Sequence, residues 1–163
     1  MSDVEQKDRI IVEELDASFC DEVASVPGGE NIRKCFACGT CAAGCPVTDV
    51  DDQYNSRRII RQILLGMREE VLSSPQIWYC VLCYRCYARC PQQVNFTDVM
   101  RALRYLALKS GHISSRILEK ADEVDHLAQM MRHDKIEDTF EGRKQIMDEL
   151  DALIAKNKEK DSQ

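Results

Sequence analysis

Residues 35–46 read Cys-Phe-Ala-Cys-Gly-Thr-Cys-Ala-Ala-Gly-Cys-Pro, and residues 80–91 read Cys-Val-Leu-Cys-Tyr-Arg-Cys-Tyr-Ala-Arg-Cys-Pro. Both stretches follow the pattern C-x-x-C-x-x-C-x-x-x-C-P, and the second begins 45 residues after the first. Together they contain eight of the nine cysteines in this chain of 163 residues. The chemistry of these eight thiols therefore decides how the chain folds.

Disulfide bonds do not suit this arrangement of thiols. The chain opens with Met-Ser-Asp-Val-Glu, which lacks the charged and then apolar segments of a secretory signal peptide. At 163 residues it is long enough to bury a core without covalent cross-links. Cysteines spaced two or three residues apart also have poor geometry for pairing. We therefore expect free thiols rather than a disulfide framework.

Zinc is the second explanation, and the third cysteine of each run disfavours it. Zinc sites usually combine one C-x-x-C pair with a second pair further along the chain. Here three cysteines follow one another at two-residue gaps, and a fourth cysteine and a proline come after them. A 4Fe–4S cubane suits this spacing, because three close thiolates bind three of its irons and the fourth iron takes a ligand from elsewhere. The pattern therefore predicts two 4Fe–4S clusters.

The same run is typical of bacterial ferredoxins with two clusters, in which the fourth cysteine of each run binds the other cluster. This resemblance implies two ligand sets that cross between the runs. The first cluster would be bound by Cys35, Cys38, Cys41 and Cys90, and the second by Cys80, Cys83, Cys86 and Cys45. Neither site is then complete without the other run, so we expect the two runs to form one folding unit.

The composition is typical of a soluble globular protein. Hydrophobic residues make up 44% of the chain and charged residues 31%. The longest runs without a charged residue have 14 residues, which is too short to cross a bilayer. Free thiols at this density indicate a reducing compartment, so we expect a cytoplasmic protein with no direct membrane span. The ninth cysteine, Cys20, stands alone in an acidic stretch, and we expect it to be an inert, partly buried thiol.

Charge is distributed unevenly along the chain. Residues 31–111 carry eleven Lys or Arg against six Asp or Glu, a net charge of +5, whereas the remainder carries eleven against twenty-two, a net charge of −11. A basic region can bind nucleic acid. A nearer explanation is that a cluster with four thiolates is an anion, whose charge neighbouring cations offset. For Arg57, Arg58 and Arg61 a merely solvated basic face is an equally good interpretation. We expect no nucleic-acid partner.

The 45-residue repeat extends beyond the cysteines. Gly66 and Gly111 each lie 21 residues after the last cysteine of their run, and they suit the ends of helices. The apolar pattern before each glycine predicts one helix over about residues 55–70 and another over about residues 97–109. The candidate N-caps are Asn55 or Ser56 for the first helix and Thr97 for the second.

These patterns predict a mostly α fold, an α-helical ferredoxin domain with two 4Fe–4S clusters plus C-terminal helices. We divide the chain into an N-terminal segment (1–27), a helical di-cluster domain (28–112), a C-terminal helical segment (113–156) and a disordered tail (157–163). In the third segment apolar residues recur at helical spacing from Ile117 to Met131 and again from Ile146 to Ile154. These helices could pack on the cluster core or on each other, or they could form a docking face for another protein of a complex.

No catalytic constellation is visible. The chain has no G-x-G-x-x-G and no G-K-[ST] loop, so it shows no dinucleotide or P-loop site. No nucleophile is paired with a base. His112, His126 and His133 are scattered over the C-terminal part, and we expect them to be surface residues rather than ligands. We therefore expect an electron carrier that is not catalytic by itself.

The wording around the cysteines resembles the C subunit of heterodisulfide reductase. The similar segments are Lys34-Cys-Phe-Ala-Cys-Gly-Thr-Cys, Trp78-Tyr-Cys-Val-Leu-Cys-Tyr-Arg-Cys and Val94-Asn-Phe-Thr-Asp-Val-Met-Arg, within residues 28–112. The cysteine pattern alone is shared with iron–sulfur subunits of succinate, fumarate, glycolate and glycerol-3-phosphate oxidoreductases. Succinate dehydrogenase-type subunits lose a ligand in one run, whereas Cys80, Cys83 and Cys86 are all present here.

The resemblance implies an electron-transfer subunit of an oxidoreductase complex. It would relay electrons from an A subunit with flavin and iron–sulfur clusters to a B subunit that reduces a disulfide. Two alternatives stay open. One is an iron–sulfur subunit of another quinone- or flavin-linked oxidoreductase, and the other is a metal-stapled binding module with no redox role.

Overall fold

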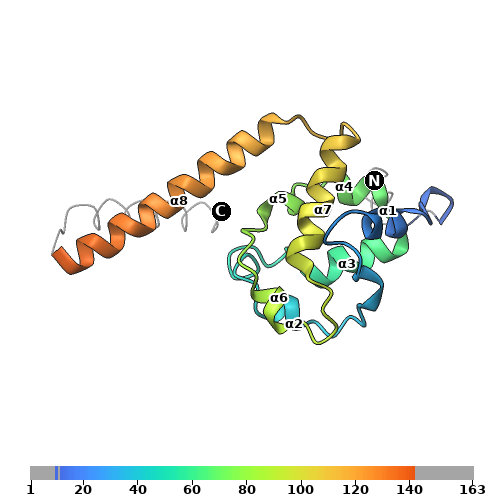
Figure 1. Cartoon of the computed structure of the whole chain (residues 1–163), viewed down its shortest axis with the longest axis horizontal. Coiled ribbons are helices and arrows are strands. Elements are labelled where there is room, and N and C mark those ends of the chain that lie inside the picture. Colours follow the sequence, from blue (N-terminus) through green and yellow to red (C-terminus); the bar gives the residue numbers. More distant parts are fainter. Residues whose placement is uncertain (1–9, 11, 142–163) are drawn as a thin grey trace, which may run out of the picture. The chain divides into compact units, whose positions relative to one another are not determined.

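The computed structural model describes residue 10 and residues 12–141 (Figure 1). In this part of the chain the secondary structure is helical and no strand is present, which confirms the prediction of a mostly α fold. Contacts divide the chain into two units, one up to Ser115 and one from Arg116 onward. The segment boundaries that we derived from the sequence remain predictions, and the tail at 157–163 lies outside the described residues.

Short helices make up most of the first unit. In chain order they are η1 (Val12–Glu14), α1 (Phe19–Ser25), η2 (Ile32–Lys34), α2 (Thr40–Ala43), α3 (Ser56–Leu65), α4 (Arg68–Leu72), α5 (Gln76–Tyr79), α6 (Arg85–Arg89) and α7 (Phe96–Lys109). Each cysteine run therefore contains one helical turn, α2 or α6, and α2 packs against α6. Figure 1 shows these two turns side by side at one end of the unit.

A single apolar core joins the longer helices of the first unit. α7 contributes Val99, Leu103 and Leu106, which recur at helical spacing and are at most 1% exposed. α1 packs against α3 and α7 and adds Phe19 and Val23, both 0% exposed. Residues before position 28 therefore help to build the same core as the cysteine runs. Cys20 lies in this core as well, at 3% exposure, so the ninth thiol is fully rather than partly buried.

The helix expected over residues 55–70 is two helices, and this part of the prediction was wrong. α3 starts at its N-cap Asn55, whose side chain accepts a hydrogen bond from the Arg58 N–H at 3.1 Å. It ends at Gly66, which has φ of +81° and a left-handed conformation. The Asp16 N–H donates to the Gly66 carbonyl at 2.8 Å, and a Cβ at Gly66 would collide with the Asp16 backbone. The chain then restarts as α4.

The predicted N-cap of the second helix was also wrong. α7 begins one residue before Thr97, and Asn95, at φ of +56°, occupies the N-cap position. Thr97 lies inside the first turn, where its hydroxyl faces a cysteine sulfur instead of capping the backbone. The end of α7 agrees with the prediction, because the helix stops at Lys109 and Gly111 follows with φ of +75°.

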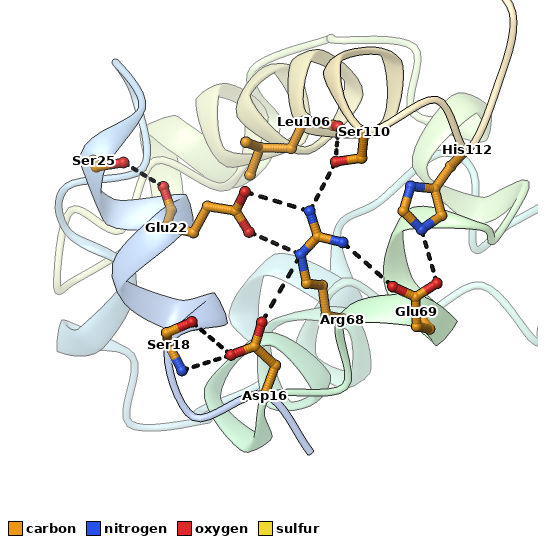
Figure 2. A network of polar contacts seen from close by, with 9 residues as sticks. All are labelled: Asp16, Ser18, Glu22, Ser25, Arg68, Glu69, Leu106, Ser110 and His112. Atoms are coloured by element: carbon orange, nitrogen blue, oxygen red, sulfur yellow. Dashed lines mark hydrogen bonds and ion pairs between the residues drawn. The ribbon is translucent and has the colours of Figure 1, made fainter. Parts of the chain in front are cut away.

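Arg68 links three helices of the first unit through its guanidinium (Figure 2). Its Nε donates to Glu22 of α1 at 2.9 Å, and one Nη donates to the Ser110 hydroxyl after α7 at 2.8 Å. Beside it, Glu69 lies 3.0 Å from His112 Nε2. The His112 side chain is only 13% exposed, so the prediction of a surface residue was wrong for this histidine. His112 is largely shielded from solvent and pairs with Glu69, which lies 43 residues earlier in the chain.

The second unit is described through one helix, α8 (Arg116–Glu141). The apolar side chains of α8 are not confined to one face, so the helical spacing noted from Ile117 to Met131 does not give this helix a distinct apolar face. Exposed examples are Val124, Leu127 and Met131, and His126 and His133 are exposed as predicted. The second apolar stretch, residues 146–154, lies outside the described residues. None of the helices in the described part is long and apolar enough to cross a membrane.

Candidate metal centres

Two neighbouring cavities lie where the cysteine runs meet. The first, with about 400 Å³ of empty space that is partly open to solvent, has Cys35, Cys38 and Cys41 in its lining together with Cys90 of the other run. The second, with about 320 Å³ of such space, has Cys80, Cys83 and Cys86 in its lining together with Cys45 of the other run. Three side chains, Cys41, Cys86 and Phe96, line both cavities. Each cavity therefore collects three cysteines of one run and the fourth of the other, and the two sites are adjacent.

The two cysteine loops share an unusual backbone. Ala37 and Leu82, at matching positions of the repeat, have φ of +59° and +49°, and Gly39 and Tyr84, also matched, have φ of +83° and +60°. Left-handed residues other than glycine are costly, so the surrounding structure must hold these turns in place. One result is that the Ala37 N–H donates to Cys35 Sγ at 3.4 Å. The fold thus directs backbone donors at the thiols.

The two loops differ where they face each other. Gly44 of the first loop corresponds to Arg89 of the second, and the guanidinium of Arg89 occupies the space that a Cβ at Gly44 would need. The small residue in one loop therefore accommodates the large cation of the other. This contact accounts for the glycine at position 44.

Hydroxyl groups accompany the cysteine sulfurs. Thr97 Oγ1 lies 3.2 Å from Cys86 Sγ, and Thr40 Oγ1 lies 3.3 Å from Cys38 Sγ. Thr97 is 1% exposed, whereas Thr40 is more accessible to solvent. Hydrogen bonds to ligand sulfurs orient them and adjust the electronic properties of a metal site.

Two further hydroxyls are buried in the wall of the second cavity. Tyr54 is 0% exposed and Ser56 is 1% exposed, and neither hydroxyl has a hydrogen-bond partner in the part of the chain that the structure describes. The Tyr54 hydroxyl lies against the Cys80 thiol, and the Ser56 hydroxyl lies against the Cys41 thiol. Buried donors without acceptors are costly. They fit a bound group that offers sulfur acceptors inside the ring of thiols, as a 4Fe–4S cluster does.

Comparison with known proteins identifies this arrangement. Residues 31–94 match the family of the 4Fe-4S dicluster domain. The C subunit of ferredoxin:CoB-CoM heterodisulfide reductase from Methanosarcina mazei is 33% identical over 139 residues, which cover 77% of this chain and 85% of that protein. The chain belongs to the family of heterodisulfide reductase C subunits. The dicluster match also confirms the prediction of two 4Fe–4S clusters.

Other members of the family extend further than the matched region. The C2 iron-sulfur subunit of CoB--CoM heterodisulfide reductase from Methanocaldococcus jannaschii is 38% identical over 112 residues, which cover 64% of this chain and 59% of that protein. The C subunit of H(2):CoB-CoM heterodisulfide,ferredoxin reductase from Methanothermobacter thermautotrophicus is 36% identical over 100 residues, which cover 61% of this chain and 53% of that protein. The chain therefore spans somewhat more than half the length of these two relatives.

Burial controls the protonation of the thiols in these heterodisulfide reductase-type sites. It raises the pKa of Cys41, Cys80 and Cys86, whereas the Thr40 hydroxyl lowers the pKa of the exposed Cys38. A thiol must lose its proton to bind iron, so metal binding must displace protons from the buried cysteines. Cations help to stabilise the resulting thiolates, and Arg57 lines the first cavity while Arg85 lines the second. This supports the electrostatic explanation of the basic middle region for these two residues.

Arg104 of α7 holds the chain that leads into the second run. Its Nε donates to the Ile77 carbonyl at 2.8 Å, and one Nη donates to the Cys80 carbonyl at 2.6 Å and the Trp78 carbonyl at 3.3 Å. The guanidinium also lies over the Trp78 ring, 5.2 Å from its centroid. The second site is thus supported from a helix that contributes none of the eight cysteines.

Sequence reasoning missed the residues that support the cysteines. Tyr54 and Ser56 stand in a polar stretch after the first run, and only the lone aromatic among polar neighbours could have drawn attention to Tyr54. The role of Arg104 has no local signal, because its partners lie 24 to 27 residues earlier in the chain. These contacts exist only once α3 and α7 pack beside the cysteine loops.

Proposed function

We propose that the chain is the electron-relay subunit of a heterodisulfide reductase-like complex. It takes electrons from an A subunit with flavin and iron–sulfur clusters, and it passes them to a B subunit that reduces a disulfide. The observation that carries this proposal is that the two cavities share Cys41, Cys86 and Phe96. Two adjacent redox groups in one small domain form a short path through it. When bound, a 4Fe–4S cluster takes up and releases one electron at a time.

The eight cysteines are the proposed ligands, in two crossed sets. One set is Cys35, Cys38, Cys41 and Cys90, and the other is Cys80, Cys83, Cys86 and Cys45. The linings of the two cavities support this assignment. Arg57, Arg85 and the hydroxyl donors offset and share the charge of the thiolates. We assign no catalytic residue to this chain.

The disulfide is reduced on the partner. The relatives are named for the CoB–CoM heterodisulfide, and we propose a disulfide of this class as the final acceptor. Its reduction takes two electrons and two protons and releases two thiols, so the relay must deliver one electron twice for each turnover. The protons come from the partner or the solvent, because the relay residues keep theirs. Free thiols at this density support a reducing cytoplasm as the location of the complex.

Paired cysteine variants test the crossed ligand sets. Cys35→Ala combined with Cys90→Ala removes two ligands of one proposed set, so one intact cluster should remain, with about four irons. Cys35→Ala combined with Cys45→Ala removes one ligand from each set, so no intact cluster should remain. If each run held its own cluster, the two results would be exchanged. Iron and sulfide analysis with electron paramagnetic resonance of the reduced protein gives the count, and Cys20→Ala should keep both clusters.

A redox titration separates the relay from a metal-stapled binding module. After anaerobic purification the relay should hold about eight irons per chain and be reduced reversibly in two one-electron steps. Fewer than four irons, or sites that do not reduce reversibly, would sink the proposal. Purification of the native complex tests the partners, because a flavoprotein and a second cysteine-rich protein should accompany this chain.

A further inference from the structure

The segment from Tyr54 to Ser56 places two buried hydroxyls in the wall of the second cavity. Tyr54 and Ser56 are at most 1% exposed, and both line the second cavity. Their hydroxyls face different sulfurs, since Tyr54 lies against Cys80 and Ser56 lies against Cys41. These two cysteines belong to different proposed ligand sets. One short segment therefore lies beside one proposed ligand of each set.

Neither hydroxyl is needed for the local backbone. The cap of α3 is made by Asn55, whose side chain accepts from the Arg58 N–H. Neither the Tyr54 hydroxyl nor the Ser56 hydroxyl has another acceptor in the described part of the chain. A buried donor that lacks an acceptor destabilises the fold. Alanine or phenylalanine would avoid that cost, so the hydroxyls indicate acceptors that belong to the bound clusters.

We propose that Tyr54 and Ser56 each donate a hydrogen bond to the sulfur of a different cluster and thereby set the two reduction potentials separately. A cluster gains one negative charge when it takes up one electron, and a donor on its sulfur stabilises this reduced form more than the oxidised form. Each hydroxyl keeps its proton throughout, so no proton is transferred. Tyr54 acts on the cluster bound by Cys80, and Ser56 acts on the cluster bound by Cys41. The inference rests on the proposed relay function.

Single substitutions in the full chain test this assignment. Tyr54→Phe should lower the potential of one of the two titration waves, and Ser56→Ala should lower the potential of the other. The double variant should lower both. The matched control is Tyr87→Phe, which removes a hydroxyl from an aromatic residue that is 43% exposed and should leave both waves unchanged. If both single variants shift the same wave, or if neither shifts any, the proposal is overturned.

A second measurement covers the case in which Tyr54→Phe does not fold. Site-specific replacement of Tyr54 by 3-fluorotyrosine keeps the hydroxyl and makes it a stronger donor, so the same wave should move to higher potential. An unchanged or lowered potential contradicts the proposed hydrogen bond. Iron analysis of the unsubstituted protein distinguishes the two proposals. Absent clusters overturn the relay function, whereas two intact clusters with unmoved waves overturn only the roles of Tyr54 and Ser56.

Discussion

Arg104 shows how one side chain can organise a loop that has no secondary structure of its own. The carbonyls of Ile77, Trp78 and Cys80 lie where α5 ends and the second run begins. Carbonyls in such a place need donors, and a planar guanidinium supplies several in a fixed geometry. The same group brings a positive charge close to the Cys80 thiol. Arg104 therefore both fixes the position of this loop and places a positive charge near the Cys80 thiol.

Replacing Arg104 by lysine should destabilise the first unit although the charge is kept. A lysine cannot reach three carbonyls with a planar fork, so we expect the free energy of unfolding to fall by about 1–3 kcal/mol. Anaerobic urea unfolding followed by helical circular dichroism measures the loss. Arg101→Lys is the matched control, because Arg101 is exposed and its only aromatic neighbour in the described residues is Tyr84, 5.5 Å away. An equal loss in both variants would show that the carbonyl contacts are not the cause.

At the scale of elements, the ends of the helices position the cysteine loops. α3 and α7 run from the region of the cysteine loops to a glycine, and each glycine lies 21 residues after the last cysteine of its run. The two glycines differ in the space around them. A Cβ at Gly66 would meet the Asp16 backbone, whereas a Cβ at Gly111 would meet nothing within 4 Å.

Alanine substitutions at these glycines should therefore differ. Gly111→Ala adds only the strain of a left-handed alanine and should cost about 1 kcal/mol of unfolding free energy. Gly66→Ala adds the same strain and a collision with backbone, and it should cost at least about 2 kcal/mol. The same urea experiment compares the two variants. Equal losses of unfolding free energy would mean that the Asp16 backbone moves away from a Cβ at position 66 without a measurable cost.

The start of α1 gives a prediction on pH. The Asp16 carboxylate accepts from the Ser18 hydroxyl at 2.6 Å and the Ser18 N–H at 2.9 Å (Figure 2), and these hydrogen bonds hold the pKa of Asp16 below its ordinary value of 3.8. The pKa of Asp16 is lower in the folded protein than in the unfolded chain. The contact therefore stabilises the fold at pH values above the pKa of the unfolded chain. This stabilisation is lost as the pH falls through the pKa of the folded protein. The stability difference between wild type and Asp16→Asn should be constant from pH 7 to 5 and shrink below about pH 4. A difference that shrinks between pH 7 and 5 would point to another group.

At the scale of the whole molecule, the metal centres belong to one unit. Every residue that lines the two cavities lies between positions 35 and 97, inside the unit that ends at Ser115. This unit also has its own apolar core. The basic region, residues 31–111, lies within this unit, so its cations belong to the part of the chain that must bind anionic clusters.

A chain that ends at Ser115 should therefore bind as much iron as the full chain. The expected content is about eight irons in both proteins, measured after anaerobic reconstitution. If the shortened chain binds less, the segment from Arg116 onward contributes to the cluster domain. This result would also correct the predicted division between residues 28–112 and 113–156.

The sequence by itself determined the metal chemistry of this protein. The spacing of the ligands is a property of the covalent chain, so eight cysteines in two C-x-x-C-x-x-C-x-x-x-C-P runs are enough to predict two 4Fe–4S clusters. The pattern of apolar residues is enough to predict the helices around them. The stop at Gly66 was indicated by the sequence, but the restart of the chain as α4 was not. The contact of Gly66 with the backbone of Asp16, 50 residues earlier in the chain, also has no local signal.

Only the tertiary structure decided what surrounds the clusters. Tyr54 and Ser56 are polar residues in a polar stretch, and nothing in their neighbours places them in the wall of a cavity. Thr97 was predicted to cap a helix, but packing places its hydroxyl beside the Cys86 sulfur. Arg104 and His112 found partners more than 20 residues away. Such contacts follow from how helices pack against one another, whereas the number and spacing of thiols follow from the order of residues in the chain.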